Sequence, residues 1–77
     1  MIWVEITETE YLAALEILPP ALRVDHGFLL DEPTIQKDGR PCYSPYLHVG
    51  GHYYAGSEPM TNQEFRALRI DELVLPA

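Results

Sequence analysis

Three histidines, one cysteine and many carboxylates are the side chains of this sequence that could support chemistry. His48 and His52 are four positions apart, a spacing at which two imidazoles on one helix face can bind a metal ion. Here Gly50-Gly51 lies between them, and a Gly-Gly pair flanked by aromatic and aliphatic residues is typical of a β-hairpin turn. Strand pairing around that turn directs the two histidines to opposite faces of the sheet. We therefore expect no metal site and no cofactor, with a small metal-binding protein as an alternative.

Cys42 lacks the surroundings that a catalytic cysteine needs. A reactive thiol requires a neighbouring base and a positive or helix-terminal setting, and the sequence places Arg40 nearby but no His–Asp arrangement. The sequence also has no Gly-rich phosphate loop and no paired carboxylates suited to acid–base catalysis. A single cysteine rules out an internal disulfide and suits a reducing compartment. The sequence therefore predicts a binding protein rather than an enzyme.

Tyrosines are concentrated in the same stretch, since four of the five lie between residues 43 and 54. The predicted hairpin places Tyr46 and Tyr53 on one face together with His48. If the core uses the opposite face of the hairpin, these tyrosines lie on the side away from the first helix and form an exposed contact surface, because tyrosine combines a rigid apolar ring with a hydroxyl. The alternative is that they fill the core or the sheet surface, where tyrosine is common.

Acidic side chains outnumber basic ones by 12 to 5, which gives a formal net charge of −7. This charge disfavours direct binding to nucleic acid or to an anionic membrane, and it suits a protein partner with a basic surface. Exposed carboxylates can also take the place of phosphates in a basic groove, as in a DNA mimic. The alternative is a solvated helix face on which Glu8 and Glu10 act only as helix caps. The predicted partner-binding residues are Glu5, Glu8, Glu16, Asp31, Glu32, Tyr46 and Tyr53.

Two helices and several strands are expected to position these side chains. The segments 7–10 and 61–64 both match the Thr-x-x-Glu capping box, which predicts helices over about 8–18 and 62–68. Pro19-Pro20 ends the first helix. Residues 27–31, ended by Glu32-Pro33, and the two arms of the hairpin 43–55 are predicted strands, and residues 2–6 are a candidate edge strand. Residues 21–24 are compatible with a helical turn or an extended segment, and residues 70–77 either add a strand or pack across the sheet.

The element order (β)αβββα(β) predicts one α+β domain spanning residues 1–77. We expect an antiparallel sheet of about three strands, with the main helix packed on one face and a short second helix. A chain of 77 residues buries only about 60% of its unfolded surface, so a monomer depends on good packing and a homodimer is an alternative. No secretory signal or membrane span is visible, which predicts a cytoplasmic protein. The predicted core consists of Leu12, Leu15, Leu18, Phe28, Leu30, Leu47, Val49, Tyr54, Phe65 and Leu68.

The order of motifs between residues 11 and 68 resembles that of small accessory proteins encoded on bacterial phages and plasmids. The matching residues are Tyr11, Leu15, Leu18-Pro19-Pro20, Gly27-Phe28-Leu29-Leu30, Glu32-Pro33, Asp38-Gly39-Arg40, Tyr54, Pro59-Met60-Thr61 and Glu64-Phe65. Such proteins include inhibitors of host defence, among them anti-CRISPR proteins. The resemblance implies an inhibitor in the host cytoplasm that docks on a nucleoprotein complex, such as a CRISPR effector subunit, and blocks its DNA path. It carries no catalytic residues, and a self-associating structural domain is the alternative.

Overall fold

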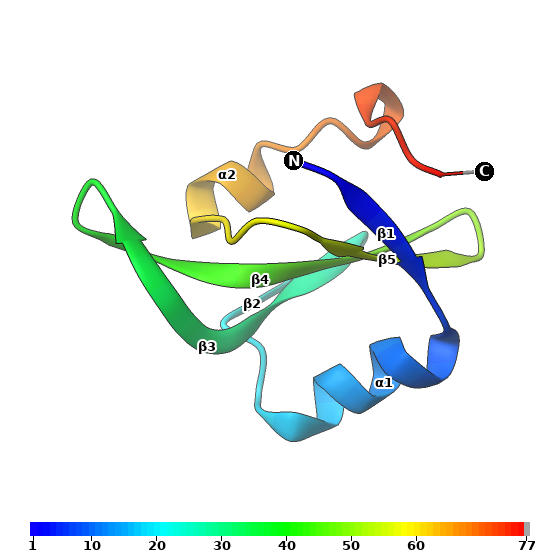
Figure 1. Cartoon of the computed structure of the whole chain (residues 1–77), viewed down its shortest axis with the longest axis horizontal. Helices are drawn as coiled ribbons and strands as arrows, with labels where there is room; N and C mark the ends of the chain where they lie inside the picture. The colour runs from blue at the N-terminus through cyan, green and yellow to red at the C-terminus, as the bar shows by residue number, and fades with distance from the viewer. Residues whose placement is uncertain (77) are drawn as a thin grey trace.

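The computed structural model describes the backbone of residues 1–76 and the side chains of residues 1–31 and 38–76. Strands and helices are interspersed along the chain and form an α+β fold (Figure 1). The elements in chain order are β1 (Trp3–Ile6), α1 (Glu8–Ile17), β2 (Leu22–Val24), β3 (Gly27–Lys37), β4 (Arg40–Val49), β5 (His52–Gly56), α2 (Asn62–Arg66) and the short 3₁₀ helix η1 (Ile70–Glu72).

The strands form one antiparallel sheet in the order β1-β5-β4-β3-β2. The predicted α+β class and antiparallel arrangement are confirmed, but the expected number of about three strands is wrong, because the sheet has five. The two additional strands are short edge strands, β1 with four residues and β2 with three. Strand β1 pairs with residues distant in sequence, such as Trp3 with Gly56, whereas the three residues of β2 pair with the start of β3, such as Leu22 with Leu29.

The predicted hairpin at Gly50-Gly51 joins β4 to β5. Val49 pairs with His52 and His48 with Tyr53, as predicted. Both turn glycines have positive φ angles, 60° and 79°, which residues with a Cβ rarely adopt. A second hairpin, at Asp38 and Gly39, joins β3 to β4.

Strand β3 is longer than predicted. Its expected end at Glu32-Pro33 is wrong, since β3 continues to Lys37. The pairing between β3 and β4 shifts register between Leu30 and Ile35. Pro33 falls within this irregularity, where a residue without a backbone N–H is tolerated in a strand.

Both predicted capping boxes are formed. At the start of α1, the Thr7 backbone N–H donates to Glu10 Oε1 at 2.9 Å, and the Glu10 N–H donates to Thr7 Oγ1 at 3.1 Å. Thr61 and Glu64 repeat this geometry at the start of α2, at 3.0 and 3.1 Å. Helix α2 ends at Arg66, before the predicted end at residue 68. The residues that follow pack across the sheet rather than adding a strand.

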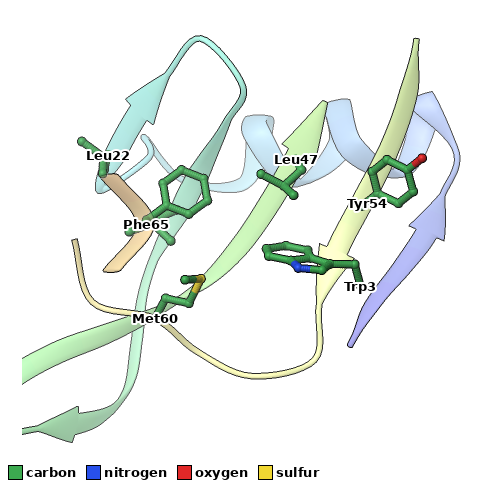
Figure 2. Packing of buried hydrophobic residues seen from close by; sticks show 7 residues of the cluster. Trp3, Leu22, Leu47, Tyr54, Met60 and Phe65 are labelled. Atoms are coloured by element: carbon green, nitrogen blue, oxygen red, sulfur yellow. The ribbon is translucent and has the colours of Figure 1, made fainter. Parts of the chain in front are cut away.

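Each face of the sheet carries its own hydrophobic cluster. The Tyr11 cluster lies beneath α1 and contains Tyr11, Ala14, Phe28 and Leu30, with Ile6, Leu15, Tyr46 and Tyr53 packed against it. The Trp3 cluster lies on the opposite face, beneath α2 and the C-terminal segment, as Figures 1 and 2 show. It contains Trp3, Leu22, Leu29, Leu47, Tyr54, Met60 and Phe65.

The expectation of a single core is therefore wrong. Phe28 and Leu47, both predicted for that core, are fully buried but belong to opposite faces. Leu12 and Leu18 are 48% and 37% exposed, because α1 meets the sheet through Tyr11 and its neighbours at helical spacing. The alternation of side chains along a strand predicts which residues share a face of the sheet, but it does not specify which helix covers which face.

Candidate functional site

Where β1 leads into α1, two predicted carboxylates each contact a residue at the start of β5, and the two contacted side chains point to opposite faces of the sheet. Glu5 Oε2 lies 2.8 Å from His52 Nδ1, and the Tyr53 hydroxyl donates a hydrogen bond of 2.8 Å to Glu8 Oε2. The antiparallel pairing of β1 with β5 sets up both contacts, because it aligns the end of β1 with the start of β5. We name Glu5, Glu8, His52 and Tyr53 the β1–α1 corner.

The β1–α1 corner holds its carboxylates in place and leaves them accessible to solvent. The pKa of Tyr53 is raised above its usual value of 10.0, first because its hydroxyl donates to Glu8, and further because of burial and the nearby negative charge. The neutral phenol therefore donates to Glu8 and leaves the negative charge of the carboxylate in place. The side chain of Glu5 is 40% exposed and that of His52 is 57% exposed.

The tyrosines of the predicted contact surface belong to a row of aromatic rings beneath α1. Tyr46 stacks on Phe28 with ring centroids 4.9 Å apart, and Tyr53 stacks on His48 at 4.3 Å. The Tyr11 ring of α1 lies 6.5 Å from Tyr46 and 4.9 Å from Tyr53. The predicted position of Tyr46 and Tyr53, on the side away from the first helix, is therefore wrong. Both are half-buried because α1 covers this face, and their role in partner binding stays a prediction.

The remaining predicted carboxylates lie outside the β1–α1 corner. Glu16 is exposed on α1, eight residues after Glu8, which corresponds to about 12 Å along a helix axis. Asp31 is exposed on β3. Glu32 lies outside the residues whose side chains the structure describes. The structure thus brings Glu8 and Tyr53 together and places Glu5 against His52, whose side chain points to the other face of the sheet from Tyr53. It places Glu16 and Asp31 elsewhere.

A groove on the face of the sheet opposite α1 was not predicted from the sequence. Its volume is about 380 Å³, and it combines apolar side chains with three glutamates. Trp3 and Met60, which form part of the underlying cluster, are visible in Figure 2. The groove requires β1, α2 and the segment after η1 to converge, and no local motif signals that convergence. The lining residues are Met1, Trp3, Glu58, Pro59, Met60, Glu64, Leu68, Glu72, Leu73 and Val74.

The histidines and the cysteine are placed in separate environments. His48 lies against Tyr53, whereas His52 contacts Glu5, and the β4–β5 pairing confirms that the two histidines point to opposite faces. Cys42 is fully buried. Among the residues that the structure describes, no three His, Cys, Asp or Glu side chains gather in an arrangement that could hold a metal ion. No helix within the described part of the chain is long and apolar enough to span a membrane.

No protein-family model, curated protein or solved structure shows a significant match to this chain. The resemblance to phage and plasmid accessory proteins therefore stays a prediction from the order of motifs.

Proposed function

We propose that this chain is a small acidic binding protein that docks on a basic surface of a nucleic-acid-handling complex and blocks that surface. An anti-CRISPR inhibitor bound to a CRISPR effector subunit is the specific form suggested by the order of motifs. The observation that carries the proposal is the β1–α1 corner, where Glu5 and Glu8 are exposed and are held by a histidine and a tyrosine. These partners fix the carboxylates while leaving negative charge available to a cationic surface.

Electrostatic complementarity supports this function. A chain with a net charge of −7 attracts a basic partner at long range and raises the rate of encounter. Each exposed ion pair contributes only about 0.2–1 kcal/mol, so carboxylates alone do not make a tight complex. Apolar contact is available next to Glu5, since Ile2 and Val4 are 69% and 53% exposed. The corner and the neighbouring β1 side chains together provide both charge and apolar area.

Self-association is the second candidate function. Strand β1 is an edge strand of the sheet, and an unpaired strand edge with exposed apolar side chains can pair with a second copy. Sedimentation of the pure protein distinguishes the two functions. A monomer at high micromolar concentration contradicts self-association, whereas a dimer that does not bind a basic partner contradicts docking.

Capture from bacterial cytoplasm followed by a competition assay tests the docking function. The wild-type protein, the double variant Glu5→Lys/Glu8→Lys and the control variant Asp25→Lys are each used as bait. Asp25 is exposed between β2 and β3, at the edge of the sheet opposite β1, so its reversal changes net charge without altering the corner. The partner identified with the wild-type bait is then purified, and its binding to nucleic acid is measured with and without each protein.

We expect the wild-type protein to displace nucleic acid from the partner. The double reversal should weaken partner binding at least about tenfold, because it replaces two attractive contacts with two repulsive ones. Asp25→Lys should weaken binding by less than about threefold. A captured partner without a nucleic-acid surface, or equal binding by wild type and the double variant, would contradict the proposal.

A further inference from the structure

The groove on the face opposite α1 has an apolar floor and acidic sides. Trp3 and Met60 are 6% and 8% exposed and form part of the Trp3 cluster, while Leu68 and Leu73 are half-buried at its edge. Glu58, Glu64 and Glu72 also line the groove. Its volume of about 380 Å³ lies at the lower end of the range of about 300–1,000 Å³ for ligand pockets.

Local features of the chain fix the walls of the groove. Gly56 pairs with Trp3, and a Cβ at Gly56 would lie 3.0 Å from Trp3 Cζ3, so this glycine allows the indole to lie close against β5. Glu64 is held at the third position of α2 by its capping box with Thr61. The Leu73 N–H donates to the Ile70 carbonyl at 3.3 Å, which returns the chain toward the groove after α2.

We propose that this groove binds a segment of the partner protein in which arginine or lysine flanks an apolar residue. This inference rests on the proposed docking function and names the contact site. The long stems of arginine and lysine can bury against apolar side chains while their charged ends meet carboxylates. The α-amino group of Met1 already lies 2.9 Å from Glu58 Oε2, so the rim accommodates a cation.

Charge complementarity favours a cationic segment over other occupants. An anionic ligand would meet three glutamates and is disfavoured, and a purely apolar segment would bury these carboxylates and their present partners away from water. Arg69 lies 3.9 Å from Glu72, and both side chains are largely exposed. Arg69 at Glu72 and the α-amino group of Met1 at Glu58 therefore both compete with an incoming cation, which predicts an effect of opposite sign when Arg69 is neutralised.

Trp3 provides a direct measurement of occupancy, because it is the only tryptophan in the chain and it lines the groove. The probe is a five-residue capped peptide, Ser-Arg-Leu-Arg-Ser, titrated at low salt while Trp3 fluorescence is recorded. The same peptide with citrulline in place of arginine has nearly the same shape without the charge. We expect the arginine peptide to shift Trp3 emission to saturation and the citrulline peptide to leave it unchanged.

The variant Glu64→Gln removes one groove charge and keeps the cap, because glutamine serves at the third position of a capping box. Its matched control is Glu10→Gln, which makes the same change in the capping box of α1, on the other face of the sheet. We expect Glu64→Gln to weaken peptide binding about threefold and Glu58→Gln/Glu64→Gln/Glu72→Gln at least about tenfold. Glu10→Gln should leave binding within about twofold, and Arg69→Gln should strengthen it.

The outcomes separate this inference from the proposed function. No binding of the arginine peptide, or equal weakening by Glu64→Gln and Glu10→Gln, would overturn the groove as the contact site, while capture and competition could still succeed through the β1–α1 corner. Peptide binding with the expected variant effects would support the groove even if the competition assay failed, and that failure would contradict the proposed function alone.

Discussion

Tyr53 connects the aromatic row beneath α1 to the acidic corner at the end of β1. Its ring stacks on His48 at 4.3 Å and lies 4.9 Å from Tyr11, while its hydroxyl donates to Glu8 at 2.8 Å. The hydrogen bond to Glu8 is the first cause of the raised pKa of Tyr53. Ionisation of this tyrosine therefore reports whether the corner is assembled.

The variant Glu8→Gln should lower the pKa of Tyr53 toward 10.0, because the carboxylate that favours the neutral phenol is removed. Ultraviolet absorbance of the phenolate as a function of pH measures this change, and Tyr53→Phe identifies which transition belongs to Tyr53. An unchanged transition in Glu8→Gln would show that the corner is not formed in solution.

The same pKa shift links Tyr53 to stability. Because the pKa is higher in the folded protein than in the unfolded chain, the stabilising contribution is complete below pH 10.0 and is lost as the pH rises through the folded value. The pKa of Tyr11 is also raised, first by burial, so its contribution is lost in the same direction. The protein should therefore unfold more readily at alkaline pH, and Glu8→Gln should reduce the part of this dependence that comes from Tyr53.

At the scale of elements, β3 and β4 leave no room for a side chain at Gly27. Gly27 pairs with Leu47, and a Cβ at Gly27 would overlap the carbonyl oxygen of Tyr46. Gly39, in the β3–β4 turn, has a φ of 76° with open space around its missing Cβ. Gly27 thus combines steric overlap with a positive φ of 158°, whereas Gly39 has a positive φ without overlap.

We expect Gly39→Ala to lower the free energy of unfolding by about 1 kcal/mol, the usual cost of a left-handed conformation for alanine. Gly27→Ala should lower it by at least about 2 kcal/mol, because strand β4 must also move to relieve the overlap. Urea denaturation measures both values. Equal losses in the two variants would show that the close approach of β3 and β4 is not part of the native sheet.

Local signals account for the elements that could be predicted from the sequence. The Gly50-Gly51 turn and the capping boxes at Thr7 and Thr61 are determined by neighbouring residues, and all three are present as predicted. The candidate edge strand at residues 2–6 is β1, but its pairing with β5 involves residues far along the chain and could not be predicted. The sequence of residues 21–24 is compatible with a helical turn or an extended segment, because β2 has only three residues and little local signal. The exposure of Tyr46 was mispredicted for a related reason, since the face covered by α1 depends on tertiary packing.

The candidate site likewise combines features set by local sequence with features set by tertiary pairing. Glu5 precedes the first capping box and Glu8 lies within it, so their position at the start of α1 could be predicted from the chain. Their partners His52 and Tyr53 are supplied by the pairing of β1 with β5, which no local pattern specifies. The groove is still less predictable, because its lining residues come from both ends of the chain.

At the scale of the whole molecule, the fold presents acidic side chains on both sides of a small sheet. The β1–α1 corner lies at one edge strand, and the glutamate-lined groove lies on the face covered by α2. Hydrophobic clusters on both faces hold these surfaces together. The proposed docking therefore depends on contact between the negatively charged side chains of this fold and a cationic protein.

The salt dependence of partner binding tests this claim most directly. Affinity for the captured partner is measured between about 50 mM and about 500 mM NaCl, over which the screening length falls from roughly 14 Å to roughly 4 Å. We predict that the wild-type affinity falls at least about tenfold over this range, and that the fall is smaller for Glu5→Lys/Glu8→Lys. An affinity that stays constant across the range, or an equal fall in both proteins, would contradict the account.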